Sequence, residues 1–313
     1  MRIAHTKPAT WPATRPGRFA ENVRTSSPEG CRVALLGLPD DTGIALNFGR
    51  IGAAAGPSAF RSALSGFGTS FDALSGQPLS TLVFDAGDVE PAAGNDEAAL
   101  FETHDRVEAA ARALHDTGMI VVAVGGGHDL SLPTIRALAE HAGQPVGGIN
   151  VDAHLDVRER VGSGMPFRRL LDQGLLDARR FVELGLGRFA NDRADVEWLR
   201  ARGAELVLVD QVLRGGLHSE RWLERALEAG PGFLSLDLDG LDAAFAPGVS
   251  ARSPLGLRVE HAAELAEAAG ARREIRHFDL MELCPAHDSE GRTARAAAYL
   301  FLAFMAGHAR RAP

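Results

Sequence analysis

Six acidic and imidazole side chains, grouped in three short motifs, are the residues of this chain best suited to chemistry. Each motif follows a short apolar run, and its members are His128 in GGGH, Asp152, His154 and Asp156 in DAHLD, and Asp237 and Asp239 in DLD. Alternate residues of an extended backbone face the same side, so the members of each motif can converge. Carboxylates gathered in this way repel one another, and two divalent cations would balance the charges of the four Asp. We therefore interpret the three motifs as the ligands of a two-metal site.

Each motif taken alone has another explanation, because an Asp after a strand often closes a turn or caps a helix. The joint occurrence of three motifs, each after an apolar run, favours the metal interpretation. Imidazole and carboxylate ligands together suit Mn²⁺ best among the common ions. An all-thiolate structural zinc site is excluded, since the chain has only Cys31 and Cys284.

The segments that must position these motifs alternate between strand and helix patterns. Nearly continuous apolar runs predict about eight strands, at residues 32–37, 81–84, 119–124, 146–151, 181–186, 205–209, 232–238 and 275–280. Helical patterns separate them, at residues 57–64, 97–115, 131–141, 167–171, 193–202, 220–229, 261–270 and 292–308. This alternation predicts an α/β fold with a parallel sheet covered by helices on both faces. Ligands of such sheets bind at the carboxyl ends of the strands, where all three motifs fall.

Composition limits the class of protein and its partners. The 313 residues are 45% hydrophobic and 24% charged, which is typical of a globular protein. No linker or repeat divides the chain, so we expect a single domain over residues 31–313, preceded by a proline-containing surface arm over residues 1–30. A net charge of −8 and the lack of a Lys/Arg-rich run argue against nucleic acid or an anionic membrane as a partner.

Several features favour a cytoplasmic location. The first 30 residues lack a signal-peptide pattern, and the apolar runs are shorter than the ~20 residues that a membrane-spanning helix needs. The two cysteines form no C-x-x-C pair, and we expect Cys284 to be a buried, inert thiol. We expect His104, His115 and His218, which have no partner pattern, to lie at the surface.

The three motifs closely resemble those of the ureohydrolase superfamily, which includes arginase, agmatinase and formimidoylglutamase. GGGH, NVDAHLDVR and SLDLDGLD match its ligand motifs in order, and the resemblance runs from about Arg32 to the end of the chain. It implies a three-layer α-β-α sandwich, with a central sheet of eight parallel strands and a binuclear manganese centre. It also implies a homo-oligomer, and two Mn²⁺ ions bound by His128, Asp152, His154, Asp156, Asp237 and Asp239.

Four further segments look specifically like formimidoylglutamase. They are NFGRIGAAAGP, SGMPFR, APGVSA and MELCPAHDSEGRTAR. The second discriminates best, because arginases and agmatinases usually carry a His where this chain has Ser163. The chain departs from the pattern at Ala243, where many members have Pro, and at Cys284, where Asn is usual.

The same resemblance implies roles for individual residues. Asp156 would accept a proton from the attacking water and pass it to the departing amine, and Glu282 would pair with the N–H groups of an amidine; a solvated surface Glu is the alternative. Ser163 would contact the substrate. Arg158, two residues after the DAHLD motif, offers a bidentate grip on a substrate carboxylate. Formimidoylglutamate has two carboxylates, whereas agmatine has none and carries a basic tail that Arg158 would repel.

We therefore expect the chain to hydrolyse N-formimidoyl-L-glutamate to L-glutamate and formamide, a step of histidine degradation. One alternative is a ureohydrolase acting on another guanidino compound, such as guanidinobutyrate, arginine or agmatine. The other is a catalytically silent, metal-binding relative, although the presence of all six ligands argues against it.

Overall fold

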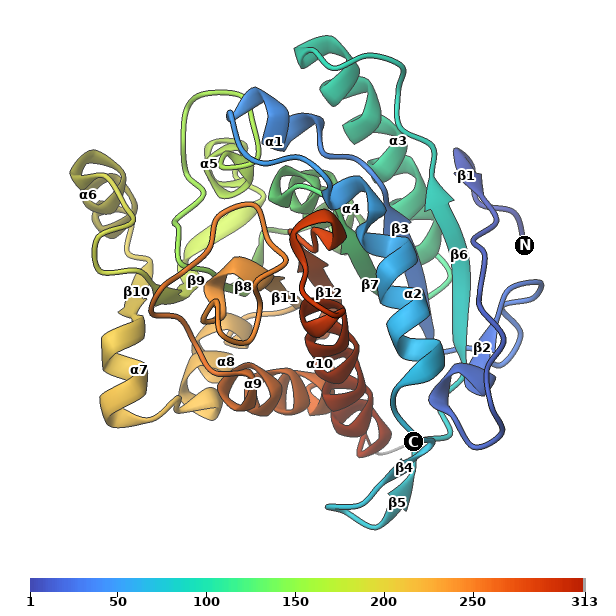
Figure 1. Cartoon of the computed structure of the whole chain (residues 1–313). Helices are drawn as coiled ribbons and strands as arrows, with labels where there is room; N and C mark the ends of the chain where they lie inside the picture. The colour runs from blue at the N-terminus through green and yellow to red at the C-terminus, as the bar shows by residue number, and fades with distance from the viewer. Residues whose placement is uncertain (312–313) are drawn as a thin grey trace.

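A mostly parallel sheet forms the middle layer of the protein in the computed structural model, which describes residues 1–311 (Figure 1). Its main strands are β3 (Val33–Leu38), β6 (Val83–Val89), β7 (Ile120–Gly125), β8 (Val146–Val151), β9 (Leu176–Leu186), β10 (Glu205–Leu208), β11 (Gly232–Asp237) and β12 (Ile275–Met281). They lie in the order β6-β3-β7-β12-β11-β8-β9-β10, and all neighbours in this order are parallel. The predicted parallel sheet is confirmed, although β6 and β9 are longer than their apolar runs suggested.

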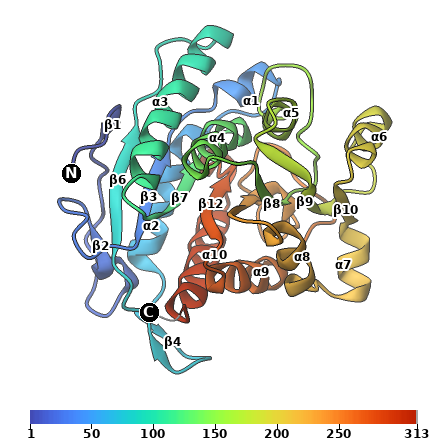
Figure 2. The same ribbon diagram turned by 180° about the vertical axis from the view of Figure 1, so that it is seen from behind.

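Helices cover both faces of this sheet, which confirms the three-layer sandwich. The helices on the face toward the viewer of Figure 1 include α2 (Gly56–Gly66), α9 (Val259–Ala271) and α10 (Arg292–Ala309). Those on the face seen in Figure 2 include α3 (Glu97–His115), α4 (Ser131–Ala142) and α5 (Pro166–Asp172). The shorter helices are α1 (Thr42–Leu46), α6 (Arg193–Ala201), α7 (Val209–Gly215) and α8 (Ser219–Leu227). Within the described residues, no helix is both long and apolar enough to cross a membrane.

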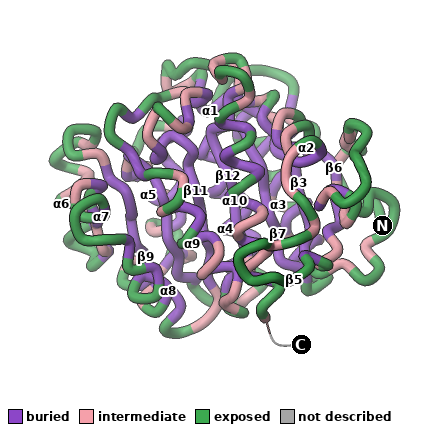
Figure 3. The backbone as a smooth tube through the Cα atoms, turned by 60° about the horizontal axis from the view of Figure 1, so that its bottom comes forward, coloured by how far each residue is buried: buried purple, intermediate pink, exposed green. Residues whose placement is uncertain are grey.

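The central strands are buried on both faces, which is why their sequences are nearly continuous apolar runs. Every residue of β3, β7, β8 and β11 is buried. The tube in Figure 3 accordingly shows buried chain through the middle of the molecule and exposed chain around it. A rigid sheet of this kind can hold side chains at its strand ends in fixed relative positions.

The first 30 residues lie along the β6 edge of the sheet. Two short strands pair with β6, namely β1 (Thr6–Lys7), which is antiparallel to it, and β2 (Val23–Arg24), which is parallel. Phe19 is buried and makes an edge contact with Phe301, with 5.7 Å between the ring centroids. The sequence did not predict β1 or β2, because a two-residue strand carries no readable pattern. The division of the chain into an arm and a domain stays a prediction.

Other small elements also lie outside the predicted pattern. They are the hairpin of β4 (Phe71–Asp72) and β5 (Gln77–Pro78), and the 3₁₀ turns η1 (Phe19–Asn22), η2 (Ala53–Ala55), η3 (His128–Leu130), η4 (Leu238–Gly240) and η5 (Pro285–His287). Two of these turns, η3 and η4, contain residues of the predicted metal site.

A buried ion pair joins α2 to β6. The guanidinium of Arg61 donates from Nε to Asp85 Oδ2 at 2.8 Å and from Nη1 to Asp88 Oδ1 at 2.6 Å. Asp85 also accepts from the Trp11 indole at 2.6 Å, so the same carboxylate holds the N-terminal segment. Breaking a buried pair leaves an uncompensated charge away from water, which destabilises a protein strongly.

We predict that Arg61→Met lowers the free energy of unfolding by about 3–5 kcal/mol, because Asp85 would remain buried without its cation. The matched control is Arg193→Met, which also removes one positive charge; Arg193 pairs with Glu197 on α6, but its side chain is 88% exposed. The control should lose about 0.5 kcal/mol or less. Urea unfolding of both variants, with equal metal content, measures the difference. Equal losses would show that this ion pair does not stabilise the fold.

Candidate metal centre

Four neighbouring strands bring the predicted metal ligands to one edge of the sheet. The strand order β7-β12-β11-β8 places the residues after β7, at the end of β11 and after β8 close together, although they are far apart in the sequence. These residues are His128, Asp237 and Asp152, each at or just past a carboxyl end. The fourth strand, β12, ends at Met281 and is followed by Glu282. This is the edge at which parallel α/β sheets bind ligands.

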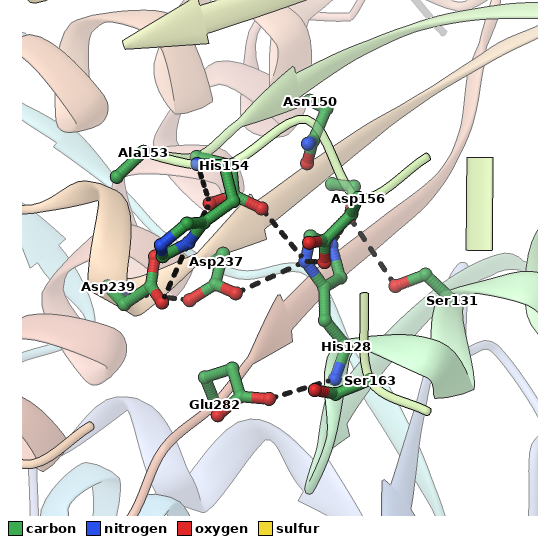
Figure 4. Close-up of polar contacts among 12 residues, drawn as sticks. His128, Ser131, Asn150, Ala153, His154, Asp156, Ser163, Asp237, Asp239 and Glu282 are labelled. Atoms are coloured by element: carbon green, nitrogen blue, oxygen red, sulfur yellow. Dashed lines mark hydrogen bonds and ion pairs between the residues drawn. The ribbon is translucent and has the colours of Figure 1, made fainter. Parts of the chain in front are cut away.

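One group of side chains converges on the imidazole of His128 (Figure 4). Its Nδ1 atom lies 3.1 Å from Asp152 Oδ2, 3.0 Å from Asp156 Oδ2 and 3.1 Å from Asp237 Oδ2. The side chain of Asp156 is 10% exposed and the other three are still more deeply buried. The four residues offer one ligand atom each within a space that a single cation could fill.

A second group lies beside the first and shares one carboxylate with it. His154 Nδ1 lies 3.3 Å from Asp152 Oδ1 and 3.3 Å from Asp239 Oδ2. Asp152 therefore turns one oxygen toward each group, as a bridging ligand between two ions would. The His154 side chain is 25% exposed, so this group is the one open to solvent.

The hydrogen bonding of these atoms fits a cation better than it fits a closed polar core. Among the described residues, the buried atoms His128 Nδ1, Asp152 Oδ2 and Asp239 Oδ1 have no hydrogen-bond partner. Buried polar atoms are rarely left unpaired, because each costs about 1–3 kcal/mol. Here His128 Nδ1 and Asp152 Oδ2 face each other at 3.1 Å, which is the arrangement that metal ligands adopt. The donor set of imidazole and carboxylate suits a divalent first-row ion.

Burial and neighbouring charges shift the pKa values of these carboxylates. Burial raises the pKa of Asp237 well above its ordinary value, and the charges of Asp239 and Asp152 add to the rise. Burial also raises the pKa of Asp239 to about 6, despite the opposing effect of His154. Burial acts in the same direction on Asp152, but its contacts with His128 and His154 lower its pKa. Bound cations would relieve this repulsion.

Turns, and not extended backbone, make the motifs converge, so our expectation about their backbone was wrong. β8 ends at Val151, and Asp156 has a positive φ of 46°. Asp152 Oδ1 accepts from the backbone N–H of His154 at 2.7 Å. Asp237 Oδ1 accepts in the same way from Asp239 at 2.7 Å. These Asx-type turns fold each motif back on itself and leave Oδ2 of Asp152 and of Asp237 facing His128.

Two glycines allow the three loops to approach closely. A Cβ at Gly126, in the GGGH motif, would lie 1.6 Å from the carbonyl oxygen of Asp40. A Cβ at Gly240, after the DLD motif, would lie 2.9 Å from the Cα atom of Asp152. Any larger residue would push the His128 loop or the Asp237 loop away from the site.

A buried hydrogen-bond network, which the sequence did not predict, fixes the ring of His128. Ser235 Oγ lies 3.0 Å from His128 Nε2 and donates to Asp279 Oδ1 at 2.6 Å. Asp279 also accepts from Ser131 Oγ at 3.0 Å. This network holds the imidazole so that Nδ1 faces the carboxylates, a common arrangement for metal-binding histidines. Ser235 lies two residues before Asp237 on β11, on the same face of the strand.

The structure corrects the prediction for two of the other histidines. His104 and His115 are buried on α3, and His104 Nε2 lies 2.8 Å from Asp129 Oδ2. Both were expected at the surface. His218 is exposed, as predicted, and Cys284 is buried.

Glu282 is aimed at the candidate metal centre. Its side chain is buried, and its Oε1 accepts from the backbone N–H of His128 at 3.1 Å. Its Oε2 is buried without a hydrogen-bond partner among the described residues, and its backbone has a positive φ of 64°. Burial raises the pKa of Glu282 well above its ordinary value. The alternative of a solvated surface Glu is therefore wrong.

The two predicted substrate contacts outside the metal site are joined by a third residue, Asn47. Its Oδ1 accepts from Arg158 Nη1 at 2.9 Å, and its Nδ2 donates to Ser163 Oγ at 3.3 Å. Ser163 also donates its backbone N–H to Gly43 at 2.9 Å. Arg158 is exposed and borders a hollow of about 450 Å³, which Arg160, Arg168 and Trp198 also line. Asn47 was not among the predicted substrate contacts, although it begins the segment NFGRIGAAAGP.

Comparisons with known proteins agree with this geometry. The family model described as "Arginase family" matches residues 31–307. A formimidoylglutamase of Halobacterium salinarum is 37% identical over 305 residues, which cover 93% of each chain. The mitochondrial guanidino acid hydrolase of Homo sapiens is 33% identical and covers 88% of this chain and 78% of its own. The crystal structure of Trypanosoma cruzi formiminoglutamase with Mn²⁺ is 31% identical and has a TM-score of 0.87, covering 94% of this chain and 99% of its own.

We predict that the loaded protein binds about two divalent ions per chain, because the six side chains form two ligand groups that share Asp152. His154→Ala removes a ligand of the second group only and should leave about one ion, whereas Asp152→Ala, which affects both groups, should leave fewer. Metal analysis after loading with Mn²⁺ and desalting measures these contents.

The exposed His218, replaced by Ala, is the control for this series and should bind as much metal as the unmodified protein. A metal content of about one ion in the unmodified protein, together with full activity, would contradict a two-metal site.

Proposed function

Because this chain belongs to the arginase family, whose members hydrolyse C–N bonds of linear amidines, we propose that it converts N-formimidoyl-L-glutamate to L-glutamate and formamide. The observation that supports this substrate is the position of Arg158, which lies two residues after the candidate ligand Asp156 and is linked through Asn47 to Ser163. The formimidoylglutamase relatives support the same choice. The proposal also includes a cytoplasmic location and a homo-oligomer, which stay predictions.

The proposed cofactor is a pair of Mn²⁺ ions. Their ligands would be His128, Asp152, His154, Asp156, Asp237 and Asp239, which form the two groups described above. The mixed imidazole and carboxylate set supports manganese, as does the Mn²⁺ in the structure of the T. cruzi relative. When bound, two such cations supply Lewis acidity and lower the pKa of water toward neutrality.

Asp156 is the proposed proton carrier. Its side chain is slightly open, at 10% exposure, while the carboxylates of Asp152 and Asp237 beside it are enclosed. Burial and the nearby charge of Asp152 raise its pKa, so it holds a proton more readily than an ordinary Asp. A carboxylate of this kind can take a proton from the attacking water and give it to the departing amine.

Glu282 is proposed to orient the amidine. Its free Oε2 atom is an acceptor in a dry site, where an amidinium N–H would give a strong, charge-assisted hydrogen bond. The bond from the His128 backbone to Oε1 fixes the carboxylate in place. The electrophilic amidine carbon, whose C–N bond to the glutamate nitrogen breaks, would then be held against the candidate metal centre at a constant orientation.

Arg158 is proposed to bind a substrate carboxylate. Among the described residues Arg158 forms no ion pair, although Glu159 and Asp195 line the same hollow. Asn47 takes only one of its N–H groups, at Nη1, so the rest of the guanidinium can bind a carboxylate in a bidentate way. Ser163 adds a hydroxyl on the same side of the site.

A guanidino acid is the second candidate substrate, because it also carries a carboxylate that Arg158 could bind. The human guanidino acid hydrolase is among the relatives and supports this alternative. Agmatine fits less well, since its terminal ammonium would approach the charge of Arg158. An assay with formimidoylglutamate, guanidinobutyrate, arginine and agmatine, each with the Mn²⁺-loaded enzyme, would separate the candidates.

We predict that Asp156→Asn loses turnover by about 100-fold or more, because the amide cannot carry the proton. The variant also weakens one ligand group, so turnover is compared with metal content in the same preparation. Near-normal turnover at full metal content would show that Asp156 is not the proton carrier.

We predict that Arg158→Ala lowers kcat/KM for formimidoylglutamate by roughly 10- to 200-fold, the effect of losing a charge-assisted contact of about 1.5–3 kcal/mol. The change should fall mainly on KM, because the contact lies away from the reacting carbon. Metal content should stay the same. Steady-state kinetics on substrates with and without carboxylates measure the loss of preference.

The control for this prediction is Arg160→Ala, which removes a positive charge from the same hollow. Arg160 donates to the carbonyl of Leu46 and packs over Phe48, so it is already engaged. The Arg160 variant should retain the substrate preference. The proposal would be wrong if the unmodified enzyme preferred agmatine, or if Arg158→Ala left the kinetics on formimidoylglutamate unchanged.

A further inference from the structure

A second hollow lies at the opposite end of the sheet from the candidate metal centre. It has a volume of about 1040 Å³ and is lined by residues that precede β3, β6 and β7, and by the last residues of α10. In Figure 1 this end of the sheet lies at the bottom, near the end of α10 and the β4–β5 hairpin, and Figure 3 brings it toward the viewer. The activity proposed above does not use any of these residues.

The charged side chains that line this hollow, among residues 1–311, are all basic. Of the described residues, five arginines and one histidine line it, and neither Asp nor Glu does; the basic residues are Arg32, Arg273, Arg276, Arg310, Arg311 and His308. The chain as a whole has a net charge of −8, so this local excess of positive charge is opposite in sign to the charge of the whole protein. Like charges gathered at one place repel one another and destabilise the folded state.

Two of these arginines are held in place by backbone groups. Arg276 donates from Nη2 to the carbonyl of Gly118 at 2.5 Å. Arg311 donates from Nε to the carbonyl of Gly270 at 2.6 Å. Neither forms an ion pair with the described residues, although Glu274 lies near enough to Arg311 to raise its pKa. Arg310, in contrast, pairs with Glu267 beside the hollow. Carbonyl groups orient a guanidinium without neutralising it, so the positive charges stay available to a ligand.

Burial and the neighbouring positive charges both lower pKa values in this cluster. Burial, together with the charges of Arg311, Arg32 and Arg276, lowers the pKa of His308 to about 4. Burial and the charge of Arg276 lower the pKa of Arg311 to about 10. His308 is therefore neutral near pH 7 and can act as a hydrogen-bond group beside the charged guanidiniums, as its contact of 3.2 Å with Thr81 Oγ1 indicates.

The hollow offers the groups that recognise phosphate. Guanidinium is planar and binds phosphate oxygens in a bidentate way, and hydroxyl groups of Ser80, Thr81 and Thr117 lie among the same lining residues. No Phe, Tyr or Trp lines the hollow in the described part of the chain, so it presents no ring on which a base could stack. We propose that this hollow binds a small polyphosphate, either free or as part of a nucleotide, through its phosphate groups.

Isothermal titration calorimetry of the Mn²⁺-loaded protein with inorganic triphosphate tests this proposal. Arg32→Gln is the first variant, because Arg32 is exposed and its side chain makes no hydrogen bond or ion pair with the described residues. Arg32→Gln/Arg276→Gln is the second. The double variant should bind triphosphate at least about ten-fold more weakly than the unmodified protein, since it loses two charge-assisted contacts.

Arg193→Gln is the matched control, since it removes one exposed positive charge far from the hollow. It should bind triphosphate as tightly as the unmodified protein. All variants keep the same metal centre, so any removal of metal by triphosphate contributes equally to each titration. If the double variant fails to fold, as judged by circular dichroism, the single Arg32→Gln variant still tests the proposal through a weakening of several-fold.

Equal affinity of the unmodified protein, Arg32→Gln and the double variant would overturn the proposal, as would the absence of any binding at low ionic strength. A parallel titration with ATP distinguishes the sources. ATP that binds as tightly as triphosphate identifies a nucleotide as an acceptable ligand, whereas binding of triphosphate alone identifies free polyphosphate.

Discussion

The repulsion among four buried carboxylates is the constraint on which the structure around the metal centre depends. The imidazole of His128 lies close to Asp152, Asp156 and Asp237. The imidazole of His154 lies close to Asp152 and Asp239. An unpaired ionised group inside a protein costs several kcal/mol, which is comparable with the whole stability of a domain. Such a cluster persists only where a rigid framework holds it and cations bind to it. The parallel sheet provides the framework, because its strand order brings the ends of β7, β11 and β8 together.

β12 links the metal centre to the groups around it. It lies between β7 and β11, and it supplies Asp279 within the sheet and Glu282 just past its end. Asp279 fixes Ser235 and through it the ring of His128, while Glu282 binds the backbone of His128 from the other side. One strand therefore orients a metal-binding imidazole from both ends and also carries the acceptor proposed for the amidine. A shift of β12 would disturb metal binding and substrate orientation together.

Features that local sequence patterns determine could be predicted, whereas features that depend on contacts between distant segments could not. The central strands β3, β7, β8 and β11 could be predicted because burial on both faces demands continuous apolar runs. β1 and β2 could not, because they form only where the edge of β6 accepts a partner. His104 and His115 were placed wrongly, although their spacing puts them on the buried face of α3 with Val107 and Ala111. Motif spacing indicated the six ligand types, but the Asx-type turns that aim them depend on contacts between loops that no single motif contains.

Helix dipoles reduce the charge repulsion at both ends of the sheet, but they are too weak to balance it. α4 begins at Ser131, close to the carboxylates, and α3 and α10 end at His115 and Ala309, close to the arginine cluster. Helix N-termini favour anions and C-termini favour cations, so each charge cluster lies where helix dipoles reduce its repulsion. Each such contribution is about 0.3–1 kcal/mol. Several kcal/mol per buried charge therefore remain unbalanced. At the carboxyl ends of the strands, two divalent cations would supply that balance, and a bound anion at the amino ends is the corresponding proposal.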